Sequence, residues 1–157
     1  MPLEIERKFL VKDDSYKSAA TEKLAVAQGY ICSTTGRTVR VRIRGEKGFL
    51  TIKGATSASG LSRYEWEKEI AVADARDLLK LCETGLIEKI RHLVPVGRHV
   101  YEVDEFLGAN AGLVVAEIEL STEEECFEKP AWLGEEVTLD RRYHNSMLAR
   151  EPYTTWK

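Results

Sequence analysis

Carboxylate and ammonium side chains alternate along the first strand-like segment of the chain. Glu4, Glu6 and Lys8 stand at every second position, while Leu3 and Ile5 fall on the opposite phase. Because successive side chains of an extended strand point to opposite faces, the three charged groups share one face. Carboxylate oxygens are the ligands that Mg²⁺ prefers, and an ammonium group binds phosphate oxygens. One short segment therefore holds groups suited to both a divalent cation and a phosphate.

Three arginines repeat this spacing later in the sequence. Arg40, Arg42 and Arg44 alternate with valine and isoleucine, so they too share a face. Like charges on one strand face repel each other, and a multiply anionic ligand would make the arrangement favourable. Further segments place charged residues on one phase: Arg63, Glu65, Glu67 and Glu69; Lys89 and Arg91; Glu102 and Asp104; and Glu117 and Glu119.

Two interpretations fit these charged faces. A single face of this kind is usually a solvated surface, where an exposed ion pair contributes about 0–1 kcal/mol. Repetition over several strands favours a shared interior instead, because closing the sheet into a barrel turns the charged faces inward and leaves the apolar faces for helices to cover. Such an interior would suit a metal-bound polyphosphate.

Period-two patterns dominate the elements that must position these groups. We expect strands at residues 3–11, 37–44, 49–53, 63–72, 86–94, 99–106 and 113–120, with a hairpin turn at 45–48 and a loop of small residues at 54–60. Helices are expected at 74–83, at 121–128 from a capping box of Ser121 and Glu124, and at 13–28 and 145–150. Many consecutive strands with a few helices predict an antiparallel-rich α+β fold.

Composition limits the classes of protein that the chain can represent. Its 157 residues, 43% of them hydrophobic, predict one domain over residues 1–157. With 23 basic and 26 acidic residues the net charge is −3, so no stable nucleic-acid partner is expected. Three scattered cysteines without a C-x-x-C pair predict a reduced, cytoplasmic location. No apolar run approaches a membrane span, so no membrane partner is expected.

The order of the charged motifs resembles a known family. Residues 4–8 form an E-x-E-x-K signature, and the chain resembles the CYTH domain, or triphosphate tunnel metalloenzyme, superfamily. The later matching segments, in the family's order, are residues 28–30, 41–44, 50–54, 62–67, 88–91, 102–104, 117–119 and 136–143. The resemblance implies an eight-stranded antiparallel barrel with helices packed outside, forming a tunnel for Mg²⁺ or Mn²⁺ and a triphosphate.

The resemblance also implies roles for individual residues. The expected metal ligands are Glu4, Glu6, Asp104, Glu117 and Glu119. The expected phosphate ligands are Lys8, Arg42, Arg44, Lys53, Arg63 and Arg91. Arg40 stays outside this set because related short bacterial members can carry an acidic residue there. Lys8 and Tyr30 match a pair associated with catalysis, although Tyr30 also fits a core aromatic residue whose hydroxyl finds a partner.

The short bacterial members of the superfamily look like inorganic tripolyphosphatases, which implies cleavage of tripolyphosphate to pyrophosphate and phosphate. Three alternatives stay open: an adenylate cyclase, a nucleoside or thiamine triphosphatase, and a non-catalytic polyphosphate-binding module or RNA-processing accessory. The carboxylate pairs disfavour the last, because acids that line an anion site are costly unless a cation joins them. A homodimer is also left open.

Overall fold

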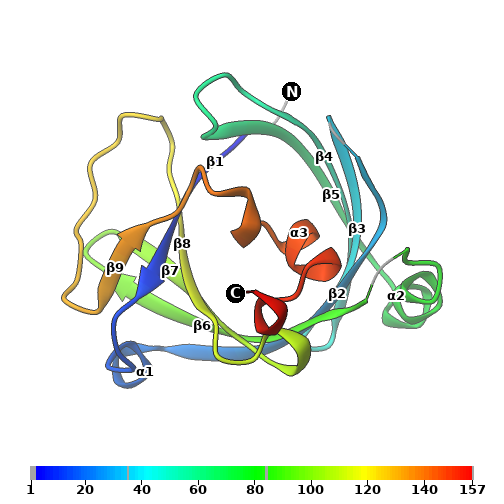
Figure 1. The fold of residues 1–157 in the computed structure, drawn as a ribbon, viewed down its shortest axis with the longest axis horizontal. Coiled ribbons are helices and arrows are strands. Elements are labelled where there is room, and N and C mark those ends of the chain that lie inside the picture. The colour runs from blue at the N-terminus through cyan, green and yellow to red at the C-terminus, as the bar shows by residue number, and fades with distance from the viewer. Residues whose placement is uncertain (1–2, 35, 84, 157) are drawn as a thin grey trace.

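Eight antiparallel strands close into a barrel in the computed structural model, which describes residues 3–34, 36–83 and 85–156 (Figure 1). Hydrogen bonding follows the order β5-β4-β3-β2-β6-β7-β8-β1, and a pairing between β1 and β5 completes the ring. A short ninth strand, β9, extends the sheet beside β1. The strands are β1 Leu3–Val11, β2 Glu22–Thr34, β3 Arg37–Arg44, β4 Lys47–Thr56, β5 Ser62–Ile70, β6 Ile87–Val96, β7 His99–Phe106, β8 Val114–Glu119 and β9 Leu133–Glu136.

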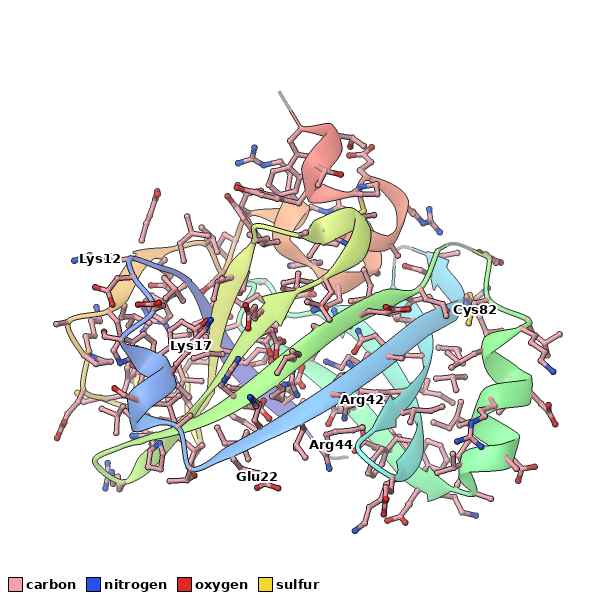
Figure 2. All side chains as sticks on the ribbon, turned by 90° about the horizontal axis from the view of Figure 1, so that it is seen from below. Lys12, Lys17, Glu22, Arg42, Arg44 and Cys82 are labelled. Carbon is pink, nitrogen blue, oxygen red and sulfur yellow. The ribbon has the colours of Figure 1, made fainter. Side chains whose placement is uncertain are left out.

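Short helices cover the outside of the barrel and one of its ends. Helices α1, Tyr16–Ala19, and α2, Val72–Leu79, lie outside the ring of strands, whereas α3, Asn145–Arg150, lies over one end (Figures 1 and 2). The 3₁₀ turns are η1 Gly108–Asn110, η2 Arg141–Tyr143 and η3 Tyr153–Thr155. We call η2, α3 and η3 together the cap. In the described parts of the chain, every helix is too short or too polar to cross a membrane.

Two tight turns set the register of neighbouring strands. Arg44 pairs with Lys47 across the β3–β4 turn, and Val96 pairs with His99 across the β6–β7 turn. Each two-residue loop begins with a glycine at positive φ, +60° at Gly45 and +62° at Gly97. Mirror-image turns of this kind need positive φ and match the twist of the flanking strands. The turns therefore fix which side chains of β3 and β4, and of β6 and β7, face inward.

The main apolar core lies on the outer face of the barrel. Val103, Ala116 and Ile118 are fully buried there, and Trp132 and Tyr16 cover them from outside the strands. These residues have the opposite phase to the charged positions of β7 and β8. Burying the apolar face outward leaves the charged face of the same strands for the interior.

The cap packs on the remaining apolar positions. Phe106 and Val115 share the phase of the charged residues on β7 and β8, yet they lie at the strand ends nearest the cap. They form a second cluster with Ile87 and Leu148 of α3. The interior of the barrel is thus apolar under this part of the cap and ionic beyond it.

Most expected elements are present, but two expected helices are wrong and two strands, β2 and β9, were not expected. The helix at 13–28 is wrong, because only Tyr16–Ala19 is helical and Glu22–Thr34 forms the long strand β2 between β3 and β6. The helix at 121–128 is also wrong: the segment is irregular, and the carboxylate of Glu125 rather than Glu124 accepts from the Ser121 amide. Strand β9 was not expected. The helices at 145–150 and, as Val72–Leu79, near 74–83 are confirmed.

Candidate active site

Two adjoining cavities, of about 70 and about 160 Å³, occupy the ionic interior of the barrel, and we call them together the tunnel. Both are lined by Glu4, Glu6, Arg40, Lys53, Arg91 and Glu117. Of the twelve site residues expected from the sequence, eleven line one cavity or the other. Asp104 is the exception. The strands thus bring the expected acids and bases to one enclosed space.

Lys8 and Glu117 form the centre of this space. They face each other on β1 and β8, with the ammonium nitrogen 3.6 Å from a carboxylate oxygen. Burial alone would lower the pKa of Lys8, but Glu117 and Glu6 raise it above its ordinary value. Burial alone would raise the pKa of Glu117, but Lys8 and Arg91 hold it far below its ordinary range. Both groups are therefore charged at neutral pH.

The remaining carboxylates of the tunnel repel one another. Burial raises the pKa of Glu6 to about 7, and the negative charges of Glu117 and Glu4 add to the rise. The pKa of Glu119 is raised by burial and by Glu4. Glu4 itself is held by Lys53, whose ammonium lies 2.8 and 3.0 Å from its two oxygens. A cation among these carboxylates would relieve the repulsion.

The arginines of the tunnel have donors to spare. Among buried side-chain atoms of the described residues, the Nε–H groups of Arg40, Arg42 and Arg63 lack a hydrogen-bond acceptor. Burial, together with repulsion from Arg40 and Arg91, lowers the pKa of Arg42 to about 9. Its neighbour on the same face of β3, Arg44, stacks 4.7 Å from the ring centroid of Phe49, and Figure 2 labels both arginines. A buried donor without a partner costs about 1–3 kcal/mol, which an anionic ligand would recover.

Asp104 holds two of the bases in place. Its carboxylate binds the guanidinium of Arg91 through two bonds of 2.8 and 2.9 Å and lies 2.7 Å from the ammonium of Lys89. Burial would raise the pKa of Asp104, but Arg91 and Lys89 hold it below its ordinary value. Both carboxylate oxygens are engaged and the side chain lines neither cavity. The geometry favours a positioning role over the metal-ligand role expected from the sequence.

Tyr30 lies at the edge of the first cavity. Its hydroxyl accepts a hydrogen bond of 3.1 Å from Gln28, and the residue is 5% exposed. Lys8 lines the same cavity as Tyr30. The ammonium of Lys8 donates to the carbonyl of Tyr143 in the cap, at 3.5 Å. Both interpretations of Tyr30, catalytic group and buried aromatic residue, fit this position.

The carboxylates fit a divalent metal by their chemistry, although they do not form a finished site. Glu4, Glu6, Glu117 and Glu119 supply only oxygen donors, which Mg²⁺ and Mn²⁺ prefer. Burial raises the pKa of Glu6, and the nearby charges of Glu117 and Glu4 add to the rise. Within residues 3–34, 36–83 and 85–156, no three acidic, cysteine or histidine side chains converge as a ready metal cluster. Lys53 and Lys8 neutralise part of the set instead.

Several tunnel residues were missing from the sequence-based set. Lys89 shares the phase of Arg91 on β6, so its spacing was a usable signal. Arg40 lines both cavities and pairs with Glu67 at 3.5 Å. His144 and Asn145 come from the cap, and Asn145 accepts a bond of 3.0 Å from Lys89. No period-two pattern marks these cap residues, because they belong to no strand.

The chain is thus a closed antiparallel barrel whose interior gathers acids, lysines and arginines. The CYTH domain model matches residues 2–153, and the chain belongs to this family. The family expected from the sequence is confirmed.

The chain is similar in sequence and in structure to inorganic triphosphatases of two bacteria. The chain is 49% identical over 158 residues to an inorganic triphosphatase of Acetivibrio thermocellus, an alignment that covers 100% of this chain and 99% of the relative. It is 37% identical over 151 residues to an inorganic triphosphatase of Nitrosomonas europaea, covering 93% and 96%. A crystal structure of the inorganic triphosphatase NE1496 superposes with a TM-score of 0.65 at 33% identity, over 95% of each chain.

Proposed function

We propose that this chain hydrolyses a linear inorganic triphosphate to pyrophosphate and phosphate inside the tunnel, with Mg²⁺ or Mn²⁺ as cofactor. The observation that carries the proposal is the set of three buried Nε–H donors, those of Arg40, Arg42 and Arg63, which lack an acceptor although carboxylates line the same interior. Phosphate oxygens are the acceptors that these donors require. The names of the two sequence relatives point to the same substrate.

Different tunnel residues would bind the phosphates and position the binding groups during phosphoryl transfer. Catalysis of this reaction is mostly positioning and neutralisation of charge on the transferred group. Arg42, Arg44, Lys53, Arg63 and Arg91 would bind phosphate oxygens along the tunnel, joined by Lys89 and Arg40. Asp104 would hold Arg91 and Lys89 in a fixed geometry, so that less entropy is lost when substrate binds.

Lys8 and Tyr30 would act next to the reacting phosphate. The ammonium of Lys8 is kept charged by Glu117 and would neutralise charge on the transferred phosphate. The Tyr30 hydroxyl, already oriented by Gln28, would direct a hydrogen bond to a phosphate oxygen or to the attacking water. Glu117 would thus hold Lys8, and Gln28 would hold Tyr30, in position before substrate binds.

Glu4, Glu6, Glu117 and Glu119 would hold the metal, with Glu4 released from Lys53 in the process. A bound divalent cation supplies neutralisation of phosphate charge and Lewis acidity. Eight basic and seven acidic side chains line the tunnel. A wall so nearly balanced suits a metal–polyphosphate complex, whose net charge is much smaller than that of free polyphosphate.

The tunnel wall favours an inorganic substrate over an organic one. All twelve residues that line the larger cavity are charged, within the described part of the chain. Among these described residues there is no apolar or aromatic side chain of the kind that a nucleobase or a thiamine ring needs for stacking. The smaller cavity adds Tyr30 and Leu61. Tripolyphosphate needs no such surface.

A phosphate-release assay tests the proposal. Tripolyphosphate, ATP, thiamine triphosphate and pyrophosphate are each supplied with Mg²⁺, with Mn²⁺ or with EDTA. We expect release from tripolyphosphate with either metal, little from the other three substrates, and none in EDTA.

Each other outcome supports a named alternative. Faster release from ATP or thiamine triphosphate would support an organic triphosphatase, and cyclic AMP formed from ATP would support a cyclase. Tight binding of tripolyphosphate without turnover would support a polyphosphate-binding module. A homodimer and a cytoplasmic location stay predictions.

A further inference from the structure

A third cavity, of about 650 Å³, opens between the cap and strands β3, β4 and β5. It is much larger than the two cavities of the tunnel and adjoins the smaller one. Thr38, Thr56, Arg63, Thr138 and His144 line both spaces. We call this third cavity the vestibule. An anion that leaves the tunnel on the side of the cap would enter it.

The wall of the vestibule carries positive charge and no negative charge. Four arginines line it, Arg37, Arg63, Arg141 and Arg150, and none of its 18 lining residues, all in the described part of the chain, is acidic. This contrasts with the tunnel, whose acids and bases nearly balance. Like charges gathered without a counter-ion repel one another, so this wall is most stable with an anion present.

The arginines of the vestibule keep most of their donors available. Arg150 approaches Glu83 at 4.0 Å and donates to the carbonyl of Ser33, and it is the one of the four with an ion pair among the described residues. Arg63 keeps a buried Nε–H without an acceptor. Arg142, by contrast, is engaged: it binds Asp140 at 2.7 Å and stacks 4.9 Å from a ring centroid of Trp156. Adjacent arginines of one turn therefore differ in whether a ligand can reach them.

The half-buried His144 lies between positively charged groups of the tunnel and the vestibule. Burial lowers the pKa of His144 to about 4, and the charges of Lys8, Arg63 and Arg141 add to the fall. The imidazole is thus neutral at physiological pH and offers a polar, uncharged wall between tunnel and vestibule. Ser57 and Ser146 add hydroxyl groups to the lining. Guanidinium and hydroxyl donors together are the groups that bind phosphate.

We infer that the vestibule is a second binding site for a phosphate group, separate from the tunnel and formed chiefly by Arg37, Arg141 and Arg150. The phosphate has two available sources, the orthophosphate released by the proposed reaction and the far end of a polyphosphate longer than three phosphates. This identification of the source rests on the proposed function, whereas binding of phosphate by the wall does not.

Calorimetric titration with orthophosphate tests the site without any turnover. Arg37 and Arg141 are exposed, so the double variant Arg37→Gln/Arg141→Gln is expected to stay folded. Arg142→Gln is the matched control, because it removes a neighbouring arginine whose side chain is already paired. We expect wild type and control to bind one phosphate more per chain than the double variant does, or to bind it about tenfold more tightly. Arg150→Gln, on α3, gives an independent second variant.

Kinetic measurements identify the source of the phosphate. If it is released product, orthophosphate inhibits wild type without competing with tripolyphosphate, and the double variant loses that inhibition. If the bound phosphate is the far end of a long polyphosphate, the double variant has a lower kcat/KM for longer polyphosphates and an unchanged kcat/KM for tripolyphosphate. Phosphate binding that is equal in wild type, double variant and Arg150→Gln overturns the inference. A chain without triphosphatase activity leaves the calorimetric result valid, so the two proposals fail separately.

Discussion

The ammonium of Lys8 and the carboxylate of Glu117 face each other across β1 and β8 at 3.6 Å, and each keeps the other charged. Glu117→Gln should therefore leave Lys8 buried without its partner and remove one proposed metal ligand. We expect metal-dependent release of phosphate to fall at least about 100-fold, with the circular dichroism spectrum unchanged. Glu136→Gln, which affects an outer-surface pair with Arg7, is the control and should keep its activity. Full activity in Glu117→Gln would remove Glu117 from the site.

Glu6 gives the protein an unusual dependence of stability on pH. Its pKa of about 7 in the folded state lies above the ordinary value of 4.5, so the folded protein holds the proton more tightly than the unfolded chain. Without metal, this group lowers the free energy of unfolding as pH rises from 4.5 through about 7.

Glu6→Gln should remove that penalty. In urea unfolding with EDTA at pH 8, we expect the variant to be more stable than wild type by on the order of 1–3 kcal/mol, and nearly equal to it at pH 5. Glu136 is the control with the opposite sign, because its pKa is lowered by Arg7 and its loss should destabilise the protein at pH 8. A difference for Glu6→Gln that does not change with pH contradicts the pKa shift.

Asp104→Asn should lower both stability and substrate affinity, because Asp104 orients two basic side chains. The substitution leaves Arg91 and Lys89 buried beside a neutral amide, and breaking a buried ion pair costs about 3–5 kcal/mol. We expect a lower free energy of unfolding and a higher KM for tripolyphosphate, with the affinity for metal little changed. Glu105→Gln, at the next position on β7, loses a contact to the buried His92 and one to the exposed Lys17, both outside the tunnel, and serves as control. A selective loss of metal affinity in Asp104→Asn would restore the metal-ligand assignment.

Tyr30→Phe separates the two interpretations of this residue. If the hydroxyl acts on the reacting phosphate or water, kcat falls about 100-fold while KM changes little. Tyr101→Phe removes a buried hydroxyl from the outer core, where it donates to the carbonyl of Glu128, and measures the effect of such a loss on folding alone. Unchanged kcat in Tyr30→Phe would leave it a buried aromatic residue.

Much of the barrel was predictable because charge and apolarity alternate at period two in its strands. The spacing of Arg40, Arg42 and Arg44 alone predicts a strand and identifies its inward face. Strand β2 was missed because its inward residues, such as Val26 and Gln28, carry no charge, and its alanines also suit a helix. Burial between β3 and β6 overrides that local preference.

In the candidate site, too, the residues on strands were predictable and the residues of the cap were not. Strand phase singled out most of the charged residues, the family resemblance added Lys53 and Tyr30, and eleven of the twelve expected residues line the tunnel. Spacing placed Asp104 on the inward face but could not predict its role. That role depends on Arg91 and Lys89 of the neighbouring strand, which engage both of its carboxylate oxygens. His144 and Asn145 depend on how the cap folds back over the barrel, which is a long-range contact with no local pattern.

The pairing of β1 with β5, β8 and β9 has a consequence for how the molecule assembles. Glu6 and Lys8 meet Glu119 and Glu117 only after residues more than 100 positions downstream have left the ribosome. Until then the part of β1 from Glu6 onward lacks its β8 partner, and the charged side chains of this part discourage it from joining a foreign strand. Contacts so distant in sequence form slowly. Closure of the ring should therefore be a late event in folding, and the acidic half of the tunnel should be its last part to become competent.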